Sequence, residues 1–376
     1  MAIIARDISK IVEKYLFKGK IIIVYGARQV GKTTLVRNIL NSSDSSNGYF
    51  NCELLSVKRQ LESLEPYKTK EFLGDSKIII LDEAQKVENI GLALKQLIDT
   101  FPDIQIVATG SSSFDLSNKI NEPLTGRAFE FKLYPLSIQE LVKYSDKKIV
   151  LESLDKILTY GLYPEVYLSG RNLAQKLIET ISSQYLYKDV LEIEQIKKPQ
   201  TIIRLLELLA MQLGSEVSIT ELATTLQINY DTVERYLDLL EKSFVIFRLR
   251  SFSRNLRKEI TKKHKVYFYD VGIRNAILNR YNALSLREDI GGLWENFLIA
   301  ERIKYLDGKE IPFNNYFWRT HDQKEVDYIE EINGKIHAYE FKWKEEGAKI
   351  PVEFLNTYKN ASFKVINKDN FLSFLV

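Results

Sequence analysis

The sequence predicts an α/β protein with a parallel sheet in its N-terminal part and further domains after it. The apolar run Ile21–Tyr25 is typical of a buried strand, and it leads through a glycine-containing loop into a predicted helix, Lys32–Leu40. Two more apolar strands, Lys77–Glu83 and Ile104–Ala108, end in polar residues, and Ser56–Leu73 before them is expected to form one helix. At 376 residues, the chain is long enough for about two or three domains.

The loop after the first strand fits the phosphate-binding pattern G-x-x-x-x-G-K-[ST] without a mismatch. Its glycines let backbone N–H groups wrap around an anion, and the N-terminus of the next helix adds the positive end of its dipole. Lys32 can reach the β- and γ-phosphates, and the Thr33 hydroxyl can ligate Mg²⁺. The nucleotide-binding residues expected in this stretch are Gly26, Ala27, Arg28, Gln29, Val30, Gly31, Lys32, Thr33 and Thr34.

Two adjacent carboxylates, Asp82 and Glu83, end the second apolar strand. Asp82 is placed to hold Mg²⁺, and Glu83 can polarise a water for in-line attack on a γ-phosphate. An acidic helix cap after a buried strand is the alternative explanation. Combined with the phosphate-binding loop, the pair predicts the second half of a nucleoside triphosphatase site.

Two further positions are weaker candidates for the same site. Ser111 or Ser112, after the strand Ile104–Ala108, could contact the γ-phosphate or the attacking water, but serines also end strands and cap helices. Arg127 lies in a loop before the predicted strand Ala128–Tyr134 and could reach a γ-phosphate in a neighbouring subunit. A solvated arginine or a local ion pair is the simpler explanation from the sequence alone.

Four motifs give the N-terminal part a family resemblance: YGARQVGKTTL, IIILDEAQ, ATGSSS and LTGRAFEFKLYPLS. They resemble AAA-type ATPases of the archaeal and bacterial group related to signal-transducing NTPases. The resemblance implies a P-loop strand at the centre of the sheet, a helical lid after it, and ATP as the nucleotide. It also implies that Ser111 is a sensor and that Arg127 is an arginine finger, which acts in a homo-oligomer.

The middle of the chain is expected to contain a winged helix. Helices are predicted over Ile202–Leu213, from Ser218 and over Asp231–Lys242, followed by strands at Phe244–Leu249 and Lys265–Tyr269. The segment Arg248–Lys265, which overlaps both strands, is strongly basic, and its eight cations against one acid suggest contact with a DNA backbone. A solvated wing or protein–protein packing remains the alternative. The cations are Arg248, Arg250, Arg254, Arg257, Lys258, Lys262, Lys263 and Lys265.

A β-hairpin is predicted near the C-terminus, where Asn333-Gly334 joins two strands. A two-residue loop places Ile332 opposite Lys335 and therefore Asp327 opposite Glu340, with Lys342 on the same face. Facing carboxylates need a cation between them. Lys342 alone could provide it, and Mg²⁺ or Mn²⁺ is the second possibility.

The set Glu295, Asp327, Glu340 and Lys342 resembles the PD-(D/E)XK nuclease fold. The resemblance implies a restriction-endonuclease-like α/β domain in which the three carboxylates hold the metal and the lysine orients a water. Val326 stands where the motif usually has proline.

The whole chain resembles a family of prokaryotic ATPases whose C-terminal domain was long of unknown function. We expect an ATPase core over 1–134, a helical lid over 135–198, a winged helix over 199–270 and a nuclease-like domain over 271–376. The expected function is ATP hydrolysis coupled to DNA cleavage, and the alternative is a nucleotide-operated switch that binds DNA or protein without cutting. One cysteine excludes a disulfide framework, and the absence of long apolar runs predicts a cytoplasmic protein without membrane spans.

Overall fold

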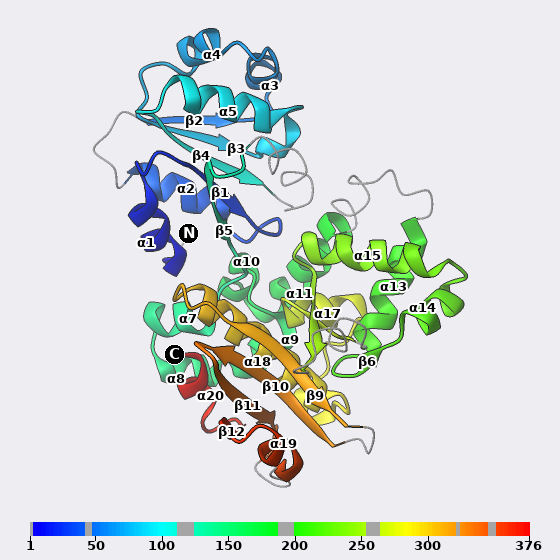
Figure 1. The fold of residues 1–376 in the computed structure, drawn as a ribbon. Helices are drawn as coiled ribbons and strands as arrows, with labels where there is room; N and C mark the ends of the chain where they lie inside the picture. Colours follow the sequence, from blue (N-terminus) through cyan, green and yellow to red (C-terminus); the bar gives the residue numbers. More distant parts are fainter. Residues whose placement is uncertain are drawn as a thin grey trace.

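The computed structural model describes residues 3–41, 47–110, 124–186, 199–252, 264–320, 324–344 and 351–376. The N-terminal part, blue to cyan, forms the upper body in Figure 1, and strand β5 (Ala128–Lys132) leads from it into the rest of the chain. Of the middle helices, those at 199–242 lie to the right of the lower body and those at 138–152 lie on its left, and the C-terminal strands, orange to red, form its base (Figure 1). Among the described residues, no helix is long and apolar enough to cross a bilayer.

The N-terminal part is a five-stranded sheet in the order β2-β3-β4-β1-β5, in which every pair is parallel. All residues of β1, β3 and β4 are buried, as the continuous apolar runs predict. The carboxyl ends of these strands therefore meet at one edge of the sheet. The elements are α1 (Asp7–Tyr15), β1 (Ile21–Tyr25), α2 (Lys32–Asn41), β2 (Asn47–Asn51), α3 (Leu55–Glu62), α4 (Pro66–Leu73), β3 (Ile78–Asp82), η1 (Ala84–Lys86), α5 (Ile90–Thr100) and β4 (Gln105–Gly110), then β5.

The single helix predicted over Ser56–Leu73 is wrong, because the structure has two helices there. The α3 helix ends before Pro66, which is the first residue of α4. Glu65 before the proline is extended, with φ −105° and ψ 94°. Steric conflict between a proline ring and the preceding residue disfavours a helical conformation at that residue, so the chain breaks here.

The middle of the chain is helical up to β6. Ser218 accepts a hydrogen bond from the Glu221 amide at 3.4 Å and caps α14, and Asn229 caps α15 through the Thr232 amide at 2.8 Å. The elements are α7 (Ile138–Tyr144), α8 (Lys147–Glu152), α9 (Leu154–Tyr160), α10 (Pro164–Leu168), α11 (Arg171–Thr180), η2 (Ile181–Leu186), α13 (Pro199–Met211), β6 (Glu216–Val217), α14 (Ile219–Leu226), α15 (Tyr230–Lys242), β7 (Ile246–Ser251), β8 (His264–Phe268), α17 (Val271–Ile277) and η3 (Leu284–Leu286).

A seven-stranded sheet in the order β12-β11-β10-β9-β7-β8-β6 joins the middle of the chain to its C-terminal part. The link is a short parallel pairing of β7 with β9, in which Arg250 faces Tyr316 and Ser251 faces Phe317. These strands were expected in two separate domains, the winged helix and the nuclease-like domain, and the structure places them in one sheet. The C-terminal elements are α18 (Ile290–Asp307), β9 (Asn314–Arg319), β10 (Glu325–Ile332), β11 (Lys335–Phe341), α19 (Val352–Thr357), β12 (Ala361–Ile366) and α20 (Phe371–Leu375).

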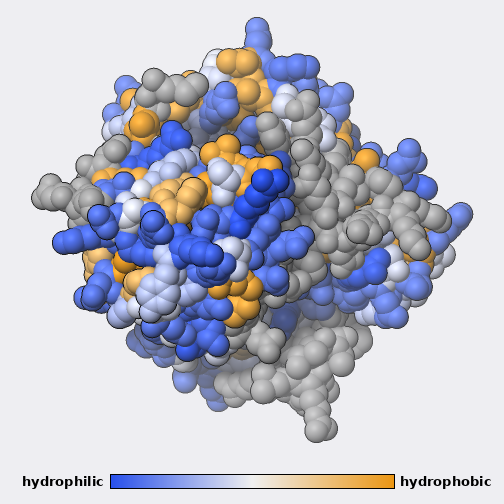
Figure 2. Space-filling view, turned by 90° about the horizontal axis from the view of Figure 1, so that it is seen from above, coloured by the Kyte–Doolittle hydropathy of each residue, from blue (hydrophilic) through white to orange (hydrophobic). Residues whose placement is uncertain are grey.

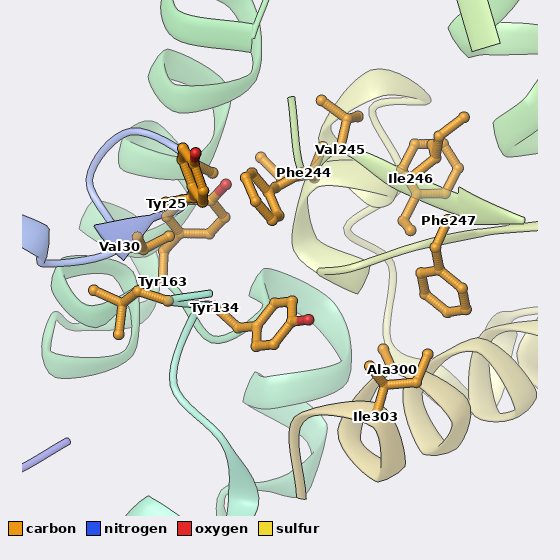
Figure 3. Packing of buried hydrophobic residues seen from close by; sticks show 14 of the residues in the cluster. Tyr25, Val30, Tyr134, Tyr163, Phe244, Val245, Ile246, Phe247, Ala300 and Ile303 are labelled. Atoms are coloured by element: carbon orange, nitrogen blue, oxygen red, sulfur yellow. The ribbon is translucent and has the colours of Figure 1, made fainter. Parts of the chain in front are cut away.

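One hydrophobic core runs from the first sheet into the lower body. Figure 3 shows its centre, where Val30 of the phosphate-binding loop, Tyr134 after β5 and Ile303 of α18 belong to the same cluster. The outer face of the N-terminal part, seen from above in Figure 2, is mostly hydrophilic with small apolar areas. The two bodies are thus packed together rather than connected only by a linker.

Candidate functional site

The phosphate-binding loop joins β1 to α2, as predicted. Gly31 has a φ of 98° and Gln29 a φ of 62°, so the loop turns through left-handed conformations. The buried Lys32 ammonium donates to the carbonyl oxygens of Gly26 and Ala27, each at 2.9 Å. The lysine is thus folded over the loop, within reach of any phosphate that the loop binds.

Gly26 packs against the chain that leaves β5. An ideal Cβ on Gly26 would lie 2.2 Å from the carbonyl oxygen of Leu133. The Leu133 amide in turn donates to the carbonyl oxygen of Tyr25 at 2.7 Å, which holds the two segments together. The first glycine of the motif is therefore required by packing as well as by the approach of a phosphate.

Arg6, near the N-terminus, holds the other side of the loop. Its guanidinium donates to the carbonyl oxygens of Val30 at 2.7 Å and Tyr134 at 2.6 Å. Its Nε lies 3.0 Å from a carboxylate oxygen of Glu140 in α7. A planar guanidinium can satisfy several acceptors at once, so Arg6 connects the loop to the segment after β5. No sequence motif indicated this role.

Asp82 lies at the end of β3, beside the loop. Its Oδ2 accepts from the hydroxyls of Thr33 at 2.7 Å and Tyr49 at 2.6 Å, and its Oδ1 accepts from the Thr109 hydroxyl. Burial and the bonded carboxylate raise the pKa of Tyr49 to about 12. Thr33 and Asp82 thus offer adjacent hydroxyl and carboxylate oxygens, the hard ligands that suit Mg²⁺. No sequence motif indicated that Tyr49 or Thr109 would contact Asp82.

Glu83 has a φ of 56°, which is left-handed and unusual for a residue with a side chain. Its amide donates to the Thr109 hydroxyl at 3.1 Å, and its Oε2 accepts from the Gln85 side chain at 2.6 Å. Backbone strain of this kind is concentrated at functional sites. The strained turn and the Gln85 contact together orient the carboxylate beside Asp82.

The loop and both carboxylates line a cleft of about 930 Å³. This volume is within the range of small-molecule sites. The lining also includes apolar side chains from the N-terminal segment and from the region after β5, a suitable environment for a nucleobase. These side chains are Ile3, Ile4, Leu136, Pro164 and Leu168.

Arg127 lies at the other edge of the sheet. Its carbonyl oxygen accepts from the amide of Ile21, the first residue of β1, at 2.9 Å, whereas the cleft is at the end of that strand. Its Nε is 2.9 Å from a carboxylate oxygen of Asp99. The structure therefore does not bring Arg127 to the cleft of its own chain. Ser111, the predicted sensor, lies outside the described residues, as does its alternative Ser112.

The C-terminal hairpin has the predicted register, with Ile332 opposite Lys335 and Tyr328 opposite Tyr339. Asp327, the next residue outward on β10, accepts a hydrogen bond from the Phe341 amide at 2.8 Å. Burial, together with the carboxylates of Glu295 and Glu340, raises the pKa of Asp327 well above its ordinary value.

Lys265 of β8, expected only as one of the basic residues of the wing, also belongs to this cluster. Its ammonium lies 3.0 Å from Glu295 Oε1 and also contacts Glu325 Oε1. Although burial disfavours the charge, these carboxylates raise the pKa of Lys265 above its ordinary value. Lys342 pairs with Glu340 at 2.6 Å.

These contacts do not fit the predicted metal site at Glu295, Asp327 and Glu340. Among the described residues, no three His, Cys, Asp or Glu side chains have an arrangement that could hold a metal ion. Two ammonium groups instead lie against the carboxylates that were expected to be ligands.

In the segment Arg248–Lys265, which is predicted to contact DNA, the first and last cations are paired with carboxylates of the protein. Arg248 is surrounded by carboxylates of α15, with contacts to Glu234, Asp238 and Glu241. Lys265 is buried in the cluster described above, whereas Arg250 is exposed. The five cations between Ser253 and Lys263 lie outside the described residues.

Comparison with known families divides the chain into three parts. Residues 18–142 match a family model described as an AAA domain. Residues 151–283 and 290–370 match two domains of unknown function, DUF8612 and DUF4143.

Uncharacterised proteins are similar over most of the chain. One from Mycobacterium tuberculosis is 25% identical over 350 residues, covering 91% of this chain and 74% of the relative. One from Methanocaldococcus jannaschii is 26% identical over 348 residues, covering 86% and 75%. A solved structure of the Thermotoga maritima RuvB Holliday junction branch migration motor covers 68% of this chain and 95% of its own, with 15% identity and a TM-score of 0.35, too low to establish a common fold. The match over 18–142, taken with the loop and carboxylate geometry, supports an AAA-type ATPase domain in the N-terminal part of this chain.

Proposed function

We propose that the protein is a Mg²⁺-dependent ATPase whose nucleotide state is transmitted to its C-terminal half. The observation that carries the proposal is the contact of Thr33 with Asp82, which unites the phosphate-binding loop with the carboxylate strand. ATP is the substrate, and Mg²⁺ supplies positive charge at its phosphates when bound. Thr33 and Asp82 would hold the ion, and Lys32 would exchange its carbonyl partners for phosphate oxygens.

Glu83 is the proposed base. Its carboxylate accepts a proton from the attacking water, and Gln85 keeps it aligned through the 2.6 Å hydrogen bond. Arg127 is 40% exposed and lies far from its own cleft along β5, so an arginine finger at this position would act in a neighbouring subunit of a homo-oligomer.

Mg²⁺ and ATP should stabilise the wild-type protein against heat. A ligand at a hundredfold excess over its Kd stabilises the folded state by about 2.7 kcal/mol, which corresponds to a Tm increase of roughly 5–10 °C. Lys32→Ala should lose most of this increase and the release of phosphate, because its ammonium is the cation nearest the expected phosphate position. A wild-type protein that ATP does not stabilise and that releases no phosphate would refute the proposal.

The route to the C-terminal half starts at Arg6 and passes through the segment after β5. The Tyr134 hydroxyl donates to Asp307 at 2.6 Å, and the Ile138 amide donates to Glu301 at 2.7 Å. Both carboxylates belong to α18, the helix that also carries Glu295. A shift of the phosphate-binding loop on nucleotide binding would be passed to α18 through these contacts. Such a continuous chain of packed groups can carry coupling between two sites.

Hydrogen exchange can test this route. ATP should slow amide exchange in α18 of the wild type, and Arg6→Leu should weaken that response even when ATP is saturating. Lys14→Met is a matched control, because Lys14 also bridges the two bodies, by an exposed pair with Glu310 at 2.9 Å. An equal response of α18 in the wild type and Arg6→Leu would show that the signal does not pass through Arg6.

DNA association stays a proposal, supported by the charge of Arg250 and of the five cations that follow it in the sequence. The switch without cleavage is favoured over a coupled nuclease, because the C-terminal carboxylates are already paired with lysines.

A further inference from the structure

The carboxylate cluster, formed by Glu295, Glu325, Asp327 and Glu340, contains a buried cation from the protein itself. The Lys265 side chain is 1% exposed, and its ammonium contacts Glu295 and Glu325. It also lies 5.5 Å from the centre of the Phe317 ring. We propose that Lys265 is the permanent cation of this cluster, in place of the divalent metal ion that the nuclease resemblance implies, and that the C-terminal part does not catalyse metal-dependent cleavage.

The position of Lys265 in the fold supports a permanent role. It lies in β8 between two neighbouring strands, where it pairs with Leu249 of β7 and with Glu216 of β6. A surface lysine can swing into water when a metal ion arrives, but a buried lysine on a strand that is paired on both sides has no such path. A divalent ion bound by Glu295 would therefore stand beside a buried ammonium, and the repulsion in a poorly solvated site is large.

The remaining carboxylates also have protein partners. Lys342 contacts Glu340 at 2.6 Å, and Arg319 lies 3.7 Å from Glu325. The Tyr267 hydroxyl donates to Glu295 Oε1, the oxygen that also contacts Lys265. One oxygen of each predicted ligand thus already has a donor of the protein itself, because Asp327 Oδ2 also accepts from the Phe341 amide.

Manganese binding to the full chain without nucleotide tests the proposal directly. Asp82→Asn removes a proposed ligand of the N-terminal site, so that bound Mn²⁺, measured by electron paramagnetic resonance, reports the C-terminal cluster. We expect no bound Mn²⁺ in this variant. Bound Mn²⁺ that is lost when Glu340→Gln is added would overturn the proposal, as would Mn²⁺-dependent DNA cleavage by the wild type that Glu340→Gln abolishes.

Lys265→Met provides the complementary test, because it leaves buried carboxylates without their cation. We expect the Tm to fall by about 10 °C or more in EDTA, and Mn²⁺ to restore several degrees of it. Lys324→Met is the control, since Lys324 pairs with Glu353 at an exposed site, and its Tm should change by about 1 °C or less. A folded Lys265→Met protein with the wild-type Tm would contradict the proposal, and if the variant does not fold, the manganese measurement decides. Neither readout requires ATP, so failure here leaves the ATPase proposal untouched.

Discussion

Glu83→Gln is expected to lower kcat for ATP hydrolysis by about 10²–10⁴-fold while ATP affinity stays nearly unchanged. Glutamine keeps the size and the hydrogen bonding of the side chain but cannot accept a proton from water. The loop and Asp82, which are expected to bind the nucleotide and Mg²⁺, do not depend on the Glu83 carboxylate. Phosphate release under single-turnover conditions, together with titration of a fluorescent ATP analogue, measures the two effects separately.

Glu88→Gln is the matched control for this prediction. It makes the same chemical change five residues further along the chain, at an exposed position that does not line the cleft. Its kcat should equal that of the wild type. If Glu83→Gln also hydrolyses ATP at the wild-type rate, Glu83 is not the base, and its left-handed conformation needs another explanation.

Gly26→Ala should destabilise the protein by about 3 kcal/mol and abolish tight ATP binding. The added Cβ would lie 2.2 Å from the Leu133 carbonyl oxygen, a backbone atom that no change of rotamer can move away. Either the loop or the chain after β5 must shift, and both carry contacts of Arg6. Thermal unfolding should show a Tm lower by roughly 6–12 °C, and the stabilisation by ATP should disappear.

Gly170→Ala separates this effect from the general consequences of replacing glycine. Gly170 has a φ of −68°, and a Cβ there would meet no atom within 4 Å. Because Gly170 is the N-cap of α11, where alanine is less favourable than glycine, its free energy of unfolding should fall by about 1 kcal/mol or less. Equal stability of the two variants would mean that the loop has more room than the structure gives it.

The features that the sequence predicted best are those encoded by a few adjacent residues. The spacing of Gly26, Gly31 and Lys32 defines the loop without reference to the rest of the fold, and Asn333-Gly334 sets the register of the hairpin. The buried strands are similarly local, because a parallel strand covered on both faces is apolar throughout. Local patterns of this kind can be recognised in a single sequence.

The contacts that escaped prediction join residues far apart in the chain. Arg6 meets Tyr134 and Glu140, and Lys265 meets Glu295 and Glu325. In the sequence, Lys265 is one of eight cations in a basic stretch, and nothing local distinguishes it from an exposed neighbour. The pairing of β7 with β9 brings β10 with Glu325 into the sheet of this lysine, and the packing of α18 against β8 supplies Glu295.

That pairing also limits how the chain can be divided. The families matched over 151–283 and 290–370 meet inside a region whose strands hydrogen-bond to each other, so a cut between them would expose the edges of both β7 and β9. Unpaired strand edges promote aggregation. The two segments are therefore one folding unit with two family signatures. We expect evolution to exchange them together, and truncated proteins that carry only one of them to be poorly soluble.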